Sequence, residues 1–213
     1  MNSIKNQTQV NCPNGCEPFE ADYFCFIRAD ENPDLKDAIL GGELHLVRCP
    51  ECGAYFHHEK ELIYLDPLNE LLVFMFPRDS KERENELRKR MQDDYRTVKD
   101  VLLKSLHLDY PPICVFGLEE LKHLLESEER NILESEAVAA SSASAGFEVV
   151  RLKPSYARMH HFPYYIPALP HSKHPEDYAL AAAKVLKSGL HSPLLLNLKD
   201  HMSQEEAVLP LLV

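Results

Sequence analysis

The sequence predicts an α+β fold in which a small antiparallel sheet is followed by amphipathic helices and then by a smaller α/β region at the C-terminus. Two observations support the sheet: short runs with strand-like alternation fill residues 19–76, and two close cysteine pairs, Cys12/Cys16 and Cys49/Cys52, lie among them. A third supports the helices: from about residue 79 the apolar residues recur with helical spacing.

The cysteine pairs have the spacing of a metal site. Cys12-Pro-Asn-Gly-Cys16 and Cys49-Pro-Glu-Cys52 place three and two residues between their cysteines, and a tight turn of that length supplies two thiolates to one tetrahedral ion. Proline fixes φ early in each turn, and glycine accepts the unusual backbone that follows. We therefore predict a zinc-ribbon-like site in which Cys12, Cys16, Cys49 and Cys52 hold one structural Zn²⁺, leaving no open position for catalysis.

The same residues allow three alternatives to this site. The cysteines could be ordinary buried thiols, or Cys49 and Cys52 could form a redox pair, although redox pairs usually lie between a strand and a helix and this one lies between two strand-like runs. His57 or His58 could replace Cys16 if the wider first turn did not reach the ion. Cys25, on an alternating strand, is interpreted as a buried apolar side chain.

Composition and charge narrow the function further. The formal net charge is −11, and residues 1–77 carry 5 Lys/Arg against 13 Asp/Glu, which disfavours binding to nucleic acid phosphates. The N-terminus has no apolar signal core, and no apolar run is long enough to cross a bilayer. We expect a cytoplasmic protein whose six cysteines stay reduced, which favours metal binding over disulfides.

The first part of the chain alternates strands with one short helix. After a polar leader, a strand is predicted over residues 19–29. A helix follows over residues 32–42, with Pro33 near its start and paired glycines at its end. Strands at 43–48 and 54–58 flank the second cysteine pair. Residues 62–65 and 71–76 then form a hairpin around a turn at Pro67.

These segments, taken in order, resemble a known family. Cys12-Pro13, residues 32–44, Cys49 to Gly53, and residues 62–66 before 73–77 resemble the CpXC domain family, and a weaker resemblance continues to residue 136. That bacterial and archaeal family is named for two Cys-Pro-X-Cys motifs, from which the first motif here departs by one added residue. The resemblance implies a zinc-binding domain and no particular reaction.

Helices dominate the middle of the chain. A helix capped by Asp79 or Ser80 is predicted to run to about residue 106, and Pro111-Pro112 precede a short strand at 113–116. A second amphipathic helix starts at Gly117. Residues 139–146 are small and uncharged, which is typical of a flexible linker. We accordingly divide the chain into a zinc-binding domain, residues 1–136, and a linker with a C-terminal α/β extension, residues 137–213.

The C-terminal extension is predicted to hold a strand at 147–152, an irregular aromatic segment, a helix at 175–188, and a last short helix begun by a capping box at Ser203 and Glu206. The aromatic segment is rich in histidine from His160 to His174. Histidines at this density could bind a second metal or act as general bases, yet a loop of this composition more often forms a packing or partner surface.

The function that we expect is a zinc-stabilised cytoplasmic module for protein interaction or regulation, with another protein or a second copy as partner. Nucleic acid and membrane partners are not expected. No nucleophile elbow, phosphate loop or dinucleotide fingerprint is present. The alternatives are an enzyme centred on residues 160–174 and a thiol redox sensor that releases its metal on oxidation.

Overall fold

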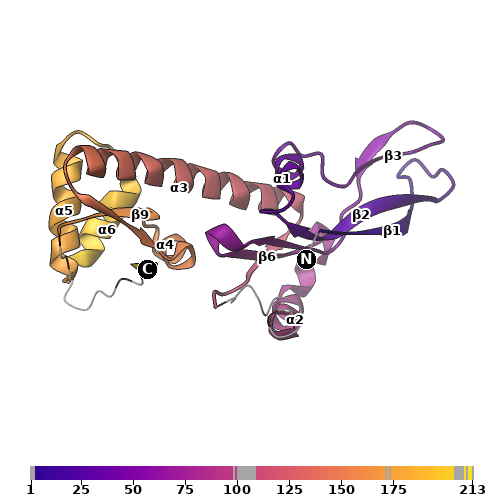
Figure 1. Ribbon diagram of the computed structural model, residues 1–213. Coiled ribbons are helices and arrows are strands. Elements are labelled where there is room, and N and C mark those ends of the chain that lie inside the picture. The colour runs from indigo at the N-terminus through magenta and orange to yellow at the C-terminus, as the bar shows by residue number, and fades with distance from the viewer. Residues whose placement is uncertain are drawn as a thin grey trace. The chain divides into compact units, whose positions relative to one another are not determined.

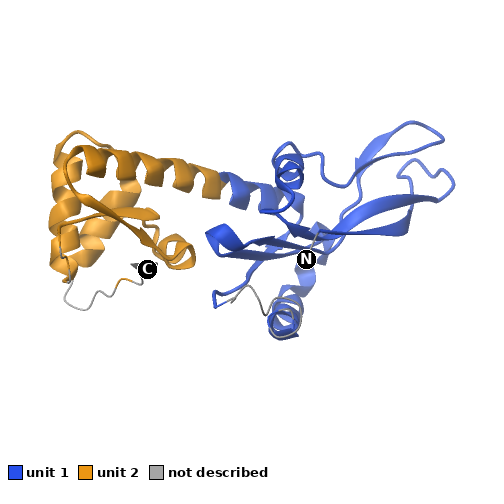
Figure 2. Ribbon diagram, in the orientation of Figure 1, with its two compact units in different colours: residues 1–126 blue, residues 127–213 orange. Residues whose placement is uncertain are grey.

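The fold was analysed in a computed structural model, which describes residues 3–97, 99, 109–170, 172, 174–203, 209 and 211–212. The chain forms two compact units, residues 1–126 and 127–213 (Figure 2). Unit 1 carries both cysteine pairs, and the mixture of helices and sheets confirms the predicted α+β class.

Unit 1 is built on a five-stranded sheet with the strand order β1-β2-β5-β6-β7 (Figure 1). β1 pairs with β2 and β5 with β6 in antiparallel fashion, whereas β2 with β5 and β6 with β7 are parallel. The sheet is therefore mixed, where the sequence predicted antiparallel pairing alone. The strands are β1 (Ile4–Val10), β2 (Phe19–Arg28), β5 (Leu62–Asp66), β6 (Leu71–Phe76) and β7 (Ile113–Phe116).

Helices cover both faces of this sheet. β6 is buried along its whole length, because its side chains point alternately into two separate cores. One core is closed by α2 (Glu84–Thr97), through Leu87 and Met91. The other is closed by α1 (Pro33–Leu40) and by the first turns of α3 (Leu118–Ser144), through Ile39, Leu121 and Leu125.

The second cysteine pair lies on a separate two-stranded sheet of β3 (Leu46–Arg48) and β4 (Tyr55–His57), which pair antiparallel. β3 is shorter than the predicted strand at 43–48, because Gly42 and His45 both have positive φ (72° and 58°) and turn the chain before Leu46. Each cysteine pair thus occupies the turn of an antiparallel hairpin, β1–β2 or β3–β4.

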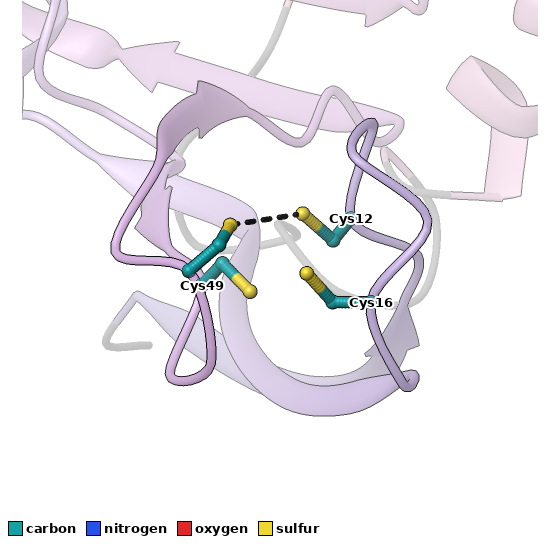
Figure 3. Close-up of side chains that lie close together, drawn as sticks. Cys12, Cys16 and Cys49 are labelled. Carbon is teal, nitrogen blue, oxygen red and sulfur yellow. Dashed lines mark hydrogen bonds between the residues drawn. The ribbon is translucent and has the colours of Figure 1, made fainter.

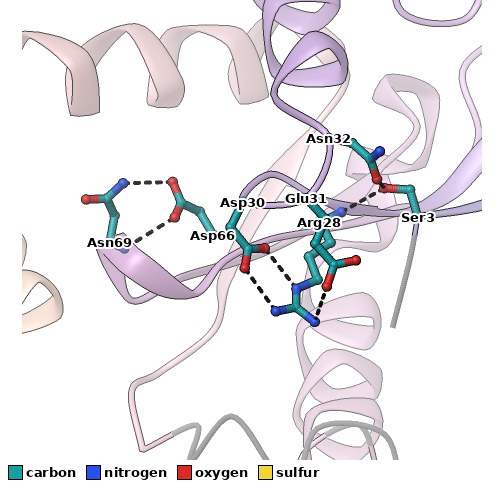
Figure 4. Close-up of polar contacts among 7 residues, drawn as sticks. All are labelled: Ser3, Arg28, Asp30, Glu31, Asn32, Asp66 and Asn69. Carbon is teal, nitrogen blue, oxygen red and sulfur yellow. Dashed lines mark hydrogen bonds and ion pairs between the residues drawn. The ribbon is translucent and has the colours of Figure 1, made fainter.

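Polar side chains close the edge of the sheet at which the parallel strands β2 and β5 end (Figure 4). Arg28 donates from Nε and Nη2 to the two carboxylate oxygens of Asp30, at 2.8 and 2.9 Å, and pairs with Glu31 at 2.8 Å. Beyond β5, Asp66 accepts hydrogen bonds from the main chain and side chain of Asn69 across the turn before β6. Arg28 and Asp66 therefore both have polar partners within the protein.

Several elements of unit 1 differ from the predicted ones. The polar leader forms β1, a largely exposed strand in which Ile4 and Thr8 are half-buried and Val10 is buried. A 3-10 helix, η2 (Arg78–Arg83), precedes α2, so Asp79 and Ser80 lie inside η2 instead of capping a long helix. The predicted continuation of α2 to residue 106 falls largely outside the described residues. The hairpin at 62–76, the helix at α1 and the strand at β7 are confirmed.

The predicted flexible linker at 139–146 is wrong, since α3 continues through Ser144. Alanine is the strongest helix former, and the Ser142 hydroxyl is buried and donates to the Val138 carbonyl one turn earlier at 2.6 Å. Burial of Val138 in the core of unit 2 therefore holds this part of the chain in the helix. The two units divide at Glu126, within α3.

Unit 2 packs four helices or helix segments on a small antiparallel sheet of order β10-β8-β9. The strand at β8 and the helix at α5 confirm the prediction, but the aromatic segment is ordered into α4 and β9. The sequence did not predict α6, and the short helix expected from Ser203 and Glu206 falls largely outside the described residues. The Ser192 side chain caps α6 by accepting from the Leu195 amide. Besides the end of α3, the elements of unit 2 are β8 (Glu148–Leu152), α4 (Pro154–His160), β9 (Tyr165–Ala168), α5 (Pro175–Lys187), α6 (Pro193–Met202) and β10 (Leu211–Leu212).

Candidate metal centre

The turn that carries Cys49 and Cys52 has the hydrogen bonds of a metal knuckle. The Gly53 amide donates to the Cys49 carbonyl at 3.0 Å, and the Cys49 amide donates to the Ala54 carbonyl at 2.9 Å. Gly53 takes φ 73°, which glycine adopts without strain. Closing the turn in this way places both thiols on one side of it.

The wider turn at Cys12 and Cys16 reaches the same geometry with one more residue. The Gly15 amide donates to the Cys12 carbonyl at 3.0 Å, and Gly15 has φ 78°. The Asn14 amide lies 3.4 Å from the Cys12 sulfur. The added residue is thus absorbed by a left-handed glycine, and Cys16 still reaches the other three thiols.

All four predicted cysteines meet at one place. Figure 3 shows Cys12, Cys16 and Cys49 pointing toward one another, and with Cys52 their four sulfur atoms lie within 4.8 Å of one another. Among the residues that the structure describes, they are the one group of three or more His, Cys, Asp or Glu side chains close enough to share a metal ion. Cys12 and Cys49 are buried, Cys16 is half-buried and Cys52 is exposed.

The spacing of the sulfurs fits a tetrahedral thiolate site. With zinc–sulfur bonds of about 2.3 Å, two sulfurs of a regular tetrahedron lie about 3.8 Å apart. The Cys12 and Cys52 sulfurs are 3.7 Å apart. Four soft thiolates in this arrangement suit Zn²⁺ and leave no position for water or substrate.

In the absence of a metal ion, the cysteines of the site have pKa values shifted in opposite directions. The main-chain amide of Ala54 lowers the pKa of Cys52 to about 6, and the side-chain amide of Asn14, which lies 3.4 Å from that sulfur, acts in the same direction. The Cys52 thiolate in turn raises the pKa of Cys16, and desolvation raises that of Cys12. A divalent cation would lower the pKa of all four cysteines and so favour the thiolate at every position.

A family model described as CpXC protein matches residues 10–128, which is more than half of the chain and includes both knuckles. The chain belongs to the CpXC family. No curated protein and no solved structure matches it in the corresponding searches. The family match covers nearly all of unit 1, so four of the five strands of the sheet and the four cysteines belong to the CpXC part of the chain.

The CpXC site includes residues that sequence reasoning missed. Asn14 was interpreted only as a turn residue, yet its amide group contacts the Cys52 sulfur of the other hairpin. The Glu17 amide donates to the Glu51 carboxylate at 3.2 Å, and the Phe19 ring meets the Phe56 ring edge-on at 6.3 Å. These three contacts join the two hairpins besides the sulfurs. Their partners are distant in sequence, so no local pattern could have indicated them.

The two histidines considered as replacements for Cys16 lie outside the cysteine cluster. His57 and His58 do not belong to the four-cysteine group, and His58 instead joins its main-chain amide to the His45 carbonyl at 3.0 Å. Cys25 is half-buried, and its sulfur accepts from Asn6 at 3.3 Å.

The histidines between residues 160 and 174 have separate surroundings. His160 packs against the rings of Tyr156 and His201, with centroids 4.3 and 5.5 Å away, and burial lowers its pKa. His174 instead caps the start of α5, and Tyr164 donates a hydrogen bond to the buried Glu128. His171 lies outside the described residues.

Within the described ranges, no helix is both long enough and apolar enough to span a membrane.

Proposed function

We propose that this CpXC protein is a zinc-stabilised module for protein interaction or regulation in the cytoplasm, with a metal that is structural and not catalytic. The observation that carries the proposal is the convergence of four sulfurs from two hairpin turns within 4.8 Å. Four protein ligands complete a tetrahedral shell, so the ion would hold the hairpins together and would not bind substrate.

The small size of the β3–β4 hairpin supports a stabilising role for the metal. The β3–β4 hairpin is a sheet of only two strands with three residues in each, which is too small to be stable by itself in water. The aromatic contact between Phe19 and Phe56 contributes little free energy compared with the binding of a structural zinc ion. The metal would therefore supply most of the free energy that holds this hairpin against β1–β2.

The partner is proposed to be another protein or a second copy of this chain. Leu46 and Tyr55 lie on the same face of the β3–β4 hairpin and are 42% and 65% exposed, so a partner that covers this face would bury them. The excess of acidic residues in this half of the chain argues against nucleic acid.

The test is the metal content of the full chain purified under reducing conditions. We expect one zinc ion per chain by elemental analysis. We also expect that a strong chelator will expose the hairpin of β3 and β4 to hydrogen exchange while unit 2 stays protected. A chain that carries no zinc, or whose protection is unchanged by the chelator, would refute the proposal.

A thiol redox sensor is a second candidate, favoured by the exposure of Cys52. An oxidant would reach this sulfur first, and the Cys12 sulfur, 3.7 Å away, is placed to form a disulfide with it. Counting free thiols and released zinc after mild peroxide treatment tests this function: release of zinc with the loss of two thiols supports it, and retention of zinc opposes it.

A further inference from the structure

A second candidate site lies away from the cysteines, at the edge of the sheet where the parallel strands β6 and β7 end. Phe76 and Phe116 are paired at the ends of these strands, and the Gly117 amide donates to the Phe76 carbonyl at 2.7 Å. The chain therefore leaves both strands side by side, at Pro77 and Gly117. Crevices outside the carboxyl ends of parallel strands are where sheets with helices on both faces bind small ligands.

Glu59, from the segment after β4, closes this edge with its own carboxylate. One carboxylate oxygen accepts from the Arg78 main-chain amide at 2.9 Å, and the other accepts from the Leu118 amide at 3.1 Å. The starts of η2 and α3 are thereby satisfied within the protein. A ligand at this edge would consequently be recognised by side chains and not by these amides.

Two adjoining hollows surround Glu59 and share His57 and Arg78 in their lining. The larger is open, with Lys60 and Asp79 on its walls. The smaller, of about 260 Å³, has an apolar wall formed by Ile39, Leu44 and Leu118. The volume of the smaller hollow suits the alkyl part of a small molecule.

The cations of this cleft have no ion pair with any residue that the structure describes. This holds for Lys60, Arg78 and Lys122, whereas other basic side chains of unit 1 each pair with a carboxylate, namely Lys5, Arg28, Lys81, Arg83, Arg88 and Arg90. The contrast is clear at the other parallel edge, where Arg28 is saturated by Asp30 and Glu31 (Figure 4). Glu59, Asp79 and Glu119 also line the cleft, so its charge is mixed. Arg78 lines both hollows, and a guanidinium group is a fork suited to a carboxylate.

We propose that this cleft binds a small apolar carboxylic acid. Arg78, with Lys60 beside it, would hold the carboxylate, and the alkyl group would enter the hollow walled by Ile39, Leu44 and Leu118. Guanidinium and ammonium groups supply the charge-assisted hydrogen bonds, and the apolar wall selects acids with a hydrocarbon part. The site is independent of the metal, so the proposal stands apart from the proposed function.

The experiment titrates the full, zinc-loaded chain with 4-methylpentanoate and follows the amide resonances by NMR. We expect shifts at Arg78 and Leu118 with a dissociation constant of order 1 mM. The neutral amide of the same acid should bind at least about tenfold more weakly, because it lacks the charge. Inorganic phosphate should also bind more weakly, because it has no alkyl group.

Arg78→Gln should weaken binding of the acid by about tenfold or more. Arg83→Gln, on the same 3-10 helix but paired with Glu86 and outside the cleft, is the matched control and should bind normally. If Arg78→Gln perturbs the fold, Lys60→Gln serves instead. The proposal is overturned if the acid shifts no cleft resonance at tens of millimolar, if the neutral amide or phosphate binds equally well, or if the variant and its control bind alike.

Discussion

The sulfur of Cys12 lies 3.7 Å from the sulfur of Cys52, although the two residues are 40 positions apart. Cys12 is buried and Cys52 is exposed, so the cluster spans the boundary between the protein interior and solvent. Two hairpin turns that share no strand pairing with each other meet at this point. A bound ion would join them by four bonds.

Replacing one ligand should therefore release the metal. In Cys16→Ser we expect zinc affinity to fall by more than about 100-fold, since loss of a ligand should exceed the effect of losing a supporting residue. Competition with a coloured chelator measures it. Cys25→Ser is the control, because Cys25 lies on β2 outside the cluster. Equal zinc affinity in the two variants would contradict the site.

His45 should make stability depend on pH. Burial and the nearby His58 lower the pKa of His45 to about 4 from 6.5, and its Nε2 accepts from the Phe24 amide at 2.9 Å. Between these two values the unfolded chain binds the extra proton, so stability is complete above about pH 6.5 and falls as pH decreases toward 4. The loss should reach roughly 2 kcal/mol at pH 5.

His45→Gln keeps an acceptor for the Phe24 amide but cannot be protonated. Urea unfolding of the zinc-loaded protein at pH 7 and pH 5 should show a smaller loss in the variant than in the wild type. Protonation of the cysteines affects both proteins equally, so the difference between them isolates His45. Identical losses would show that His45 does not titrate on unfolding.

Gly117 is expected to tolerate no side chain. It has φ 85°, and an added Cβ would lie 3.2 Å from both Arg78 Cβ and a Glu59 carboxylate oxygen. Gly117→Ala should lower the free energy of unfolding of unit 1 by about 1–3 kcal/mol. Gly42→Ala, at φ 72° with open space around it, carries the backbone cost alone and should lose less. Equal losses would mean that the contacts at Gly117 relax freely.

Unit 2 contains a buried ion pair whose disruption should be costly. Arg158 donates from Nε and Nη2 to the Glu128 carboxylate at 2.7 and 3.1 Å, and Glu128 is 4% exposed. Tyr164 donates to the same carboxylate. Arg158→Met should cost about 3–5 kcal/mol, because it leaves a buried charge without its partner.

The double variant Arg158→Met with Glu128→Gln should recover much of that stability, because no buried charge remains and the amide still accepts from Tyr164. The stability of both variants is measured by thermal unfolding, with hydrogen exchange within unit 2 as the readout. A double variant as unstable as the single one would show that packing of Arg158, and not its charge, stabilises unit 2.

The sequence by itself determined those features that depend on neighbours within a few positions. The two knuckles follow from cysteine spacing and from glycine at positive φ, the β5–β6 hairpin from its apolar runs and turn, and α5 from Pro175 at its start and Gly189 beyond its end. Local hydrogen bonds and backbone preferences suffice to specify each of these.

The tertiary structure alone decided which distant segments meet. Parallel pairing of β2 with β5 and of β6 with β7, the fate of the alanine-rich residues 139–144, and the closure of the sheet edge by Glu59 all depend on contacts between residues remote in sequence. Residues 139–144 show the reason: their small, uncharged composition is compatible with a linker or with a helix, and burial of Val138 and Ser142 stabilises the helix. Burial is a property of the folded chain, so no short stretch of sequence records it.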